Sequence, residues 1–152
     1  MYALSDTGAY GCHALTVTGN TGQKTLNLYN APNLKFEAHV VYTNTPPSGA
    51  FRGYGVPQGF FPLEVHIEKI AHQLGIDPIE FRLKNFVKAG DELPMSKAWN
   101  EGRPPHPETI ETCGMSECVA EGAKAINYQF PISKSQFPTS DNHIVEGKPH
   151  LR

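Results

Sequence analysis

The chain has 152 residues, enough for one modest domain with a core of its own. Its formal net charge is −2 and no basic stripe stands out, so the composition gives no support to nucleic-acid binding. No apolar run is long enough to cross a bilayer, and we expect no membrane partner.

The first 43 residues have the composition of short strands joined by turns. The candidate strands are residues 2–5, 15–18, 25–29 and 35–43. Residues 35–43 are the strongest candidate, because apolar and polar side chains alternate along the segment. The glycine- and asparagine-rich residues 19–22 indicate a turn. We therefore expect an α+β fold with a small, mostly antiparallel sheet.

The stretch around which the chain is organised is AFRGYGVPQ, residues 50–58, between a strand and a helix. Gly53 and Gly55 allow a positive φ or the close approach of another group. Arg52 brings a permanent charge with a planar fork of donors, and Tyr54 brings an aromatic face with a polar tip. This set would suit an anionic or oxo-bearing group beside a planar molecule. A plain tight turn, with a solvated arginine and a packed tyrosine, is the alternative.

Two amphipathic helices are expected after this turn. The first has one apolar face made of Leu63, Ile67, Ile70 and Leu74. Pro62 predicts that its regular part begins only there. Asp77 followed by Pro78 is a helix start, and the second helix should cover residues 78–88. We expect the two helices to form a hairpin packed on one face of the sheet.

The rest of the chain carries weaker patterns. A third, short helix is expected over residues 116–126, with Cys118 and Ile126 facing inward. Residues 128–152 are rich in Pro, Ser and Asn and are expected to form a tail or an interdomain linker. The three cysteines are too few for a disulfide framework, so we expect reduced thiols and a cytoplasmic location. No metal site is predicted among the protein's own side chains.

Several motifs, in one order along the chain, resemble the molybdenum hydroxylases, the xanthine dehydrogenase and aldehyde oxidase family. They are DTGAY at residues 6–10, AFRGYGVPQ at 50–58 and GIDPIEFRLKN at 75–85. The resemblance covers residues 1–127 and implies the latter part of a first molybdenum-cofactor-binding domain. The family's GGGFG loop and its GxGE segment, which holds the catalytic glutamate, do not occur in the sequence. We therefore expect a fragment of a catalytic subunit that is inactive alone.

The resemblance also implies the chemistry of the intact enzyme. It implies a molybdenum–molybdopterin cofactor, with iron–sulfur clusters and FAD on partner subunits or domains of a hetero-oligomer. The intact enzyme would hydroxylate a purine such as xanthine, or a related planar heteroaromatic, with oxygen taken from water. This reaction would belong to purine catabolism. Relatives that act on nicotinate, aldehydes or aromatic substrates remain alternatives. So does a non-catalytic scaffold module that has kept the fold and lost the chemistry.

The site residues are carried over from the same resemblance. It places Ala50, Phe51, Arg52 and Gly53 against the cofactor. Arg52 would serve catalysis by donating hydrogen bonds to oxygen ligands or cofactor atoms, and Tyr54 would stack on a planar substrate. Gly53 stands where copper-containing carbon monoxide dehydrogenases carry a cysteine, which argues against that branch.

Overall fold

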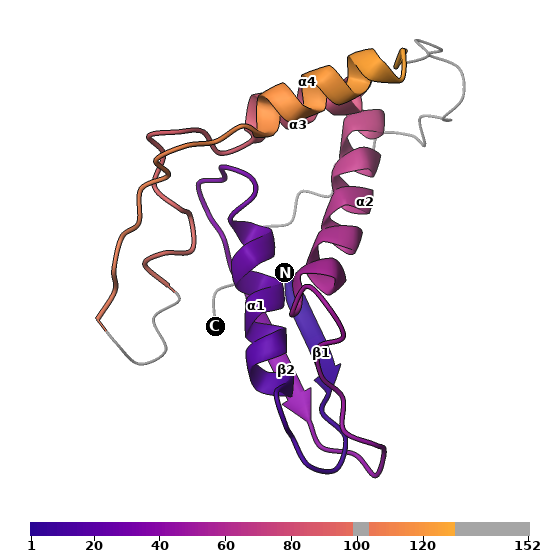
Figure 1. Cartoon of the computed structure of the whole chain (residues 1–152), viewed down its shortest axis with the longest axis vertical. Helices are drawn as coiled ribbons and strands as arrows, with labels where there is room; N and C mark the ends of the chain where they lie inside the picture. Colours follow the sequence, from indigo (N-terminus) through magenta and orange to yellow (C-terminus); the bar gives the residue numbers. More distant parts are fainter. Residues whose placement is uncertain (99–103, 130–152) are drawn as a thin grey trace, which may run out of the picture.

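The computed structural model of the chain describes residues 1–98 and 104–129 (Figure 1). In chain order the elements are β1 (Tyr2–Asp6), α1 (Ala14–Leu26), β2 (Glu37–Val41), α2 (Val56–Leu74), α3 (Pro78–Asn85) and α4 (Met115–Ala125). This is the predicted α+β class. Most of the expected tail or linker, residues 130–152, lies outside the described residues.

The two described strands pair in parallel, not antiparallel as expected. Tyr2 is the register partner of Glu37, and Asp6 that of Val41. Parallel neighbours need a crossover connection, and α1 is that connection, so β1, α1 and β2 form a βαβ unit. The expectation was wrong because the strands expected at 15–18 and 25–29 lie in α1 or directly after it.

Helix α1 is rich in glycine and threonine, residues that are typical of turns and strands. Close packing of the helix on the sheet side explains one of these glycines. Gly22, which the sequence placed in a turn, lies against the ring of Phe36 just before β2. A Cβ added at Gly22 would stand 2.5 Å from Cδ2 of that ring. The helix therefore needs a small residue here, despite the poor helix propensity of glycine.

The opposite side of α1 packs equally closely against α2. A Cβ added at Gly59 of α2 would lie 2.6 Å from the carbonyl oxygen of Thr21 and closer still to the hydroxyl of Thr25. The side chain of Thr25 is fully buried at this contact. Glycine on one helix and short threonines on the other thus let the two backbones approach each other.

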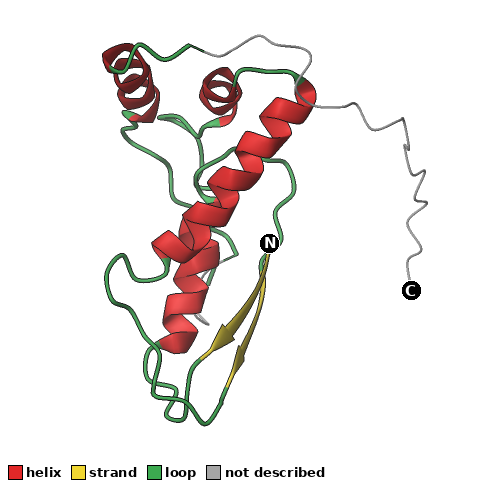
Figure 2. Cartoon of the chain, turned by 90° about the vertical axis from the view of Figure 1, so that its right-hand side faces the viewer, coloured by secondary structure: helices red, strands yellow, loops and turns green. Residues whose placement is uncertain are grey.

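Each element packs on the one before it, in the order sheet, α1, α2, α3 and α4 (Figures 1 and 2). The strands are covered by α1, α2 packs on α1, α3 packs on α2, and α4 packs on α3. Helices α2 and α3 therefore pack on each other as predicted, but they cross steeply and do not lie antiparallel as a hairpin (Figures 1 and 2). The pair contacts α1 through α2, and not the sheet as expected, because the unpredicted helix α1 occupies the sheet face.

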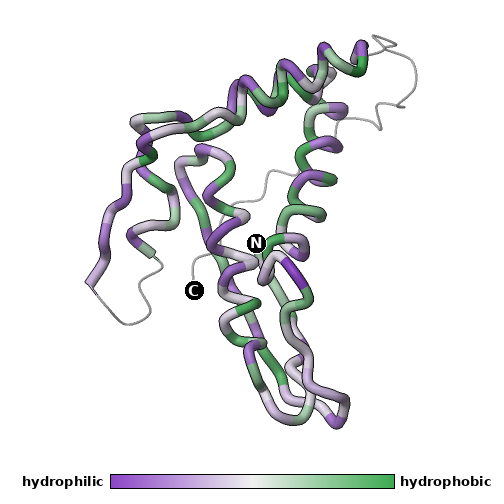
Figure 3. Tube along the Cα trace, in the orientation of Figure 1, coloured by the Kyte–Doolittle hydropathy of each residue, from purple (hydrophilic) through white to green (hydrophobic). Residues whose placement is uncertain are grey.

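Helix α2 is continuous from Val56 to Leu74, so the expected start near Pro62 was wrong. Pro62 lies on the exposed side, where water can satisfy the carbonyl that loses its partner. The alternation of apolar and polar residues along α2 is visible in Figure 3. Ala71 is its fully buried apolar residue, whereas Leu74, expected on the buried face, is 60% exposed.

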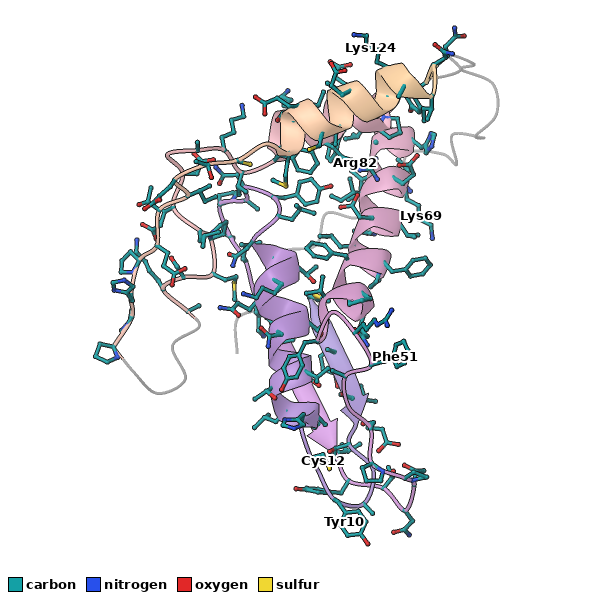
Figure 4. The ribbon with its side chains drawn as sticks, viewed as in Figure 1. Tyr10, Cys12, Phe51, Lys69, Arg82 and Lys124 are labelled. Atoms are coloured by element: carbon teal, nitrogen blue, oxygen red, sulfur yellow. The ribbon has the colours of Figure 1, made fainter. Side chains whose placement is uncertain are left out.

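A cap and an ion-pair cluster fix α3 at the end of α2. The Oδ1 atom of Asp77 accepts hydrogen bonds from the backbone of Ile79 at 2.7 Å, as expected for an N-cap. The guanidinium of Arg82 donates to Glu64 and to Glu68 of α2, both at 2.8 Å (Figure 4). The hydroxyl of Tyr29, after α1, donates to Glu64 at 2.7 Å, so three segments meet at one cluster.

The last described part of the chain contains the expected third helix, but its inward-facing residues differ from those expected. Residues 88–98 and 104–112 run antiparallel at one point, where Glu92 and Thr109 form a bridge. Helix α4 is present, but Cys118 and Ile126 are exposed instead of facing inward. Among the described residues, no helix combines the length and apolarity that crossing a membrane requires.

We expect Gly59→Ala to lower the free energy of unfolding by about 1–3 kcal/mol, the usual range for overpacking. The new methyl group would meet the backbone at Thr21, which cannot rotate away. Gly122→Ala in α4 is the matched control, because its Cβ meets nothing within 4 Å. It should stabilise by about 0.4–1 kcal/mol. Urea unfolding measures both, and equal effects of the two variants would contradict close packing of α1 on α2.

Candidate functional site

The candidate site is the turn at residues 50–55, directly before α2. Three successive residues in it have a left-handed backbone, with φ of 76° at Gly53, 43° at Tyr54 and 94° at Gly55. The two glycines thus adopt the positive φ that the sequence suggested. Tyr54 has a Cβ, and a left-handed conformation costs such a residue about 1–3 kcal/mol, so it persists only where the surroundings hold it.

The first half of this turn projects into solvent. Residues 50–53 are exposed, and Phe51 is 92% exposed and extends away from the ribbon (Figure 4). The Arg52 guanidinium lies 5.6 Å from the centroid of the Phe51 ring. Within the described part of the chain, Arg52 makes no ion pair and residues 50–55 donate no backbone-to-backbone hydrogen bond. The turn therefore offers an exposed cation and an exposed aromatic ring beside backbone N–H groups that have no backbone partner.

The second half of the turn is held by α1. The Tyr54 hydroxyl lies 2.6 Å from Oγ1 of Thr16 and 3.4 Å from Nδ1 of His13. The Thr21 hydroxyl donates to the carbonyl of Gly55 at 2.9 Å. The structure thus brings all five predicted site residues into one turn, but it directs the Tyr54 hydroxyl toward α1.

The approach to the turn is held by β1 through Asp6. Its Oδ1 atom accepts hydrogen bonds from the backbone of Gly8 and from the hydroxyl of Thr43, both at 2.7 Å. The Thr45 hydroxyl lies 3.4 Å from the other carboxylate oxygen, and the Ser48 hydroxyl donates to the Asp6 carbonyl. The aspartate of the DTGAY motif therefore ties the end of β1 to the loop that leads into the turn.

Sequence reasoning missed the residues that support the turn. Within the DTGAY motif Asp6 and Gly8 form a local turn, but the bonds to Thr43 and Ser48 span 37 and 42 residues. Thr16 lay in an expected strand. No spacing along the chain indicates such partners, so the resemblance to a family's motif was the available signal.

The donor set determines what the turn can bind. Among residues 1–98 and 104–129, no group of three His, Cys, Asp or Glu side chains could hold a metal ion directly. The available groups at the turn are the Arg52 guanidinium, backbone N–H groups and aromatic faces. Such groups bind anionic or carbonyl oxygens and flat rings, which is the chemistry of an organic cofactor or ligand.

Comparison with protein families places this turn in a known context. Residues 1–86 match the family model of the molybdopterin cofactor-binding domain. The chain belongs to this family. The resemblance to the molybdenum hydroxylases, stated above from the motifs, is thereby confirmed.

Individual relatives of this family differ in the substrates that their names give. The chain is 35% identical to the xanthine dehydrogenase molybdenum-binding subunit of Escherichia coli O157:H7, over 83% of the chain and 15% of that subunit. It is 41% identical to the nicotinate dehydrogenase large molybdopterin subunit of Eubacterium barkeri, over 59% of the chain and 21% of that subunit. The solved structure of the aldehyde oxidoreductase from Desulfovibrio gigas matches with a TM-score of 0.66 and 28% identity. That match covers 83% of the chain and 13% of the oxidoreductase.

We expect Asp6→Asn to destabilise the protein in a pH-dependent manner. The backbone N–H of Gly8, followed by the Thr43 hydroxyl, holds the pKa of Asp6 below its ordinary value. A depressed pKa means that the carboxylate stabilises the fold above the unfolded pKa of about 3.9, and that this contribution is lost as the pH falls through the folded pKa. The difference in unfolding free energy between the two proteins should therefore shrink from about pH 7 to about pH 3.

Urea unfolding at several pH values measures this difference. Thr43→Val is the matched variant, since it removes one donor to Asp6 and should show a smaller change of the same sign. A difference between wild type and Asp6→Asn that stays constant across the pH range would contradict the role of the carboxylate.

Proposed function

We propose that this chain forms part of the cofactor site of a molybdenum hydroxylase, an oxidoreductase of the xanthine dehydrogenase and aldehyde oxidase type. The observation that carries the proposal is the exposed turn at residues 50–53, which lies inside the matched region and presents unpaired donors. Residues 1–127 would be the latter part of the first cofactor-binding domain. The chain spans 15% of the length of the Escherichia coli subunit, so the activity belongs to a larger assembly.

The donors at the turn fit molybdopterin. This cofactor carries a phosphate and a flat pterin with several acceptor atoms, and an arginine fork with adjacent N–H groups pairs with both. Position 53 needs glycine, because its φ is 76° and an added Cβ would lie 2.8 Å from Cδ of Pro57. Ala50, Phe51, Arg52 and Gly53 would therefore hold the cofactor through backbone donors and the guanidinium.

Each residue of the turn has a separate task in the proposed reaction. The bound cofactor supplies the two-electron oxidation in which water provides the oxygen. Arg52 would stabilise negative charge that develops on an oxygen next to it, through a charge-assisted hydrogen bond. Tyr54 would offer its ring to a flat substrate, because its hydroxyl is already bonded to Thr16.

The substrate we propose is a purine such as xanthine, or a related planar heteroaromatic. The Escherichia coli relative and the aromatic residue at position 54 favour it. The names of the other relatives keep nicotinate and aldehydes as alternatives. Electrons would leave through iron–sulfur clusters to FAD on partner subunits of a cytoplasmic hetero-oligomer.

In the cofactor-loaded enzyme that contains this chain, Arg52→Gln should lower kcat or the molybdenum content by about 10- to 100-fold. This range corresponds to the loss of one charge-assisted hydrogen bond, about 1.5–3 kcal/mol. Lys69→Gln is the matched control, because it removes an exposed cation from α2 (Figure 4). Steady-state kinetics and metal analysis measure both variants. Equal behaviour of the two variants would count against the proposed cofactor contact.

The 152-residue chain alone should retain no stoichiometric molybdenum and should oxidise neither purines nor aldehydes. A turn that is exposed on its outer side supplies only part of a binding shell, and a bound group needs the remainder to be held. Mass spectrometry after gel filtration measures the metal. Molybdenum that stays with the chain at one equivalent would show that this chain holds the whole site.

A further inference from the structure

The side chain of Tyr54 ends in a closed set of hydrogen bonds on the first turn of α1. The Thr16 hydroxyl donates to the carbonyl of His13 at 3.0 Å. A hydroxyl has one proton to donate, so the 2.6 Å contact between Thr16 and Tyr54 has the tyrosine as its donor. The tyrosine oxygen is then left as an acceptor toward Nδ1 of His13, 3.4 Å away. The hydrogen bonds thus form a closed set, with Nδ1 of His13 at one end and the carbonyl of His13 at the other.

The hydrogen bond from Tyr54 to Thr16, called the tether below, holds a residue whose backbone conformation is unfavourable. Tyr54 has a φ of 43°, and its two neighbours, Gly53 and Gly55, have φ of 76° and 94°. A residue with a Cβ adopts such a conformation only when its surroundings hold it. Thr16 bonds the side chain of Tyr54, and Thr21, also on α1, bonds the carbonyl of the next residue. Two turns of α1 therefore hold the strained position, one through the tyrosine side chain and one through the carbonyl of the next residue.

We propose that Thr16 is a positioning residue that fixes the plane of the Tyr54 ring and so favours flat substrates over small aliphatic ones. The inference rests on the proposed function, because it needs the turn at residues 50–55 to line the substrate site. With its hydroxyl donated to Thr16, Tyr54 presents a ring face and not a hydrogen bond to a ligand. The edge-to-face contact of His13, with ring centroids 6.2 Å apart, limits rotation of that ring.

The tether itself is tested on the full 152-residue chain by NMR relaxation of the amides of residues 53–55. Thr16→Val keeps the shape and removes the hydroxyl, Thr16→Ser keeps the hydroxyl, and Thr112→Val is a matched exposed control. Thr16→Val and Tyr54→Phe should each increase motion of the turn, and the double variant should add nothing further. Unchanged relaxation in Thr16→Val would overturn the inference whatever the cofactor does.

The effect on substrate is tested in the cofactor-loaded enzyme, with xanthine or nicotinate as the flat substrate and acetaldehyde as the small one. Thr16→Val should raise KM for the flat substrate by about two- to tenfold, with kcat nearly unchanged. Thr16→Ser, which keeps the hydroxyl, should leave KM near the wild-type value. KM for acetaldehyde should change less.

Two outcomes of the kinetic test separate this inference from the proposed function. If Tyr54→Ala raises KM for the flat substrate while Thr16→Val does not, the tyrosine meets substrate and the positioning role of Thr16 is wrong. If Tyr54→Ala also leaves KM unchanged, the turn does not line the substrate site. That result would overturn the proposed role of Tyr54, and the inference with it.

Discussion

The close contact between α1 and α2 determines the position of everything that follows it in the chain. Gly59 of α2 lies against the backbone of Thr21 and the hydroxyl of Thr25, with no space for one added carbon. Because α1 also packs on both strands, this contact places the start of α2 relative to the sheet. The turn at residues 50–55 lies directly before α2, so its location depends on small residues that are buried between the two helices.

Local patterns predicted the elements whose causes are local. Asp77 caps α3 because its own side chain accepts hydrogen bonds from the backbone N–H groups of Ile79 and Glu80, and Gly75 ends α2 because glycine tolerates a φ of 68°. Helix α1 was missed because its glycines and threonines are required by Phe36 and α2, which are distant in the sequence. The parallel pairing was missed for the same reason, since without a crossover helix the strands read as a meander.

The site divides in the same way. The glycines and the arginine of the turn are visible as a sequence pattern, and the family resemblance assigns them a ligand. The supports of the turn are not visible, because the hydroxyl that bonds Tyr54 lies 38 residues earlier and the hydroxyl that bonds Asp6 from the far side lies 37 residues later. A pattern search finds residues that share a turn. Residues that share only a hydrogen bond appear when the chain is folded.

The turn therefore combines a held half with an open half, and this combination suits binding. At Tyr54 and Gly55 the backbone conformation is fixed by α1, so the cost of ordering it is met when the chain folds and not when a ligand arrives. At Arg52 and its neighbours the donors are exposed, so a ligand displaces water and breaks no bond within the described protein. A residue such as Thr16 can then alter the site from outside it, because it sets where the open half begins.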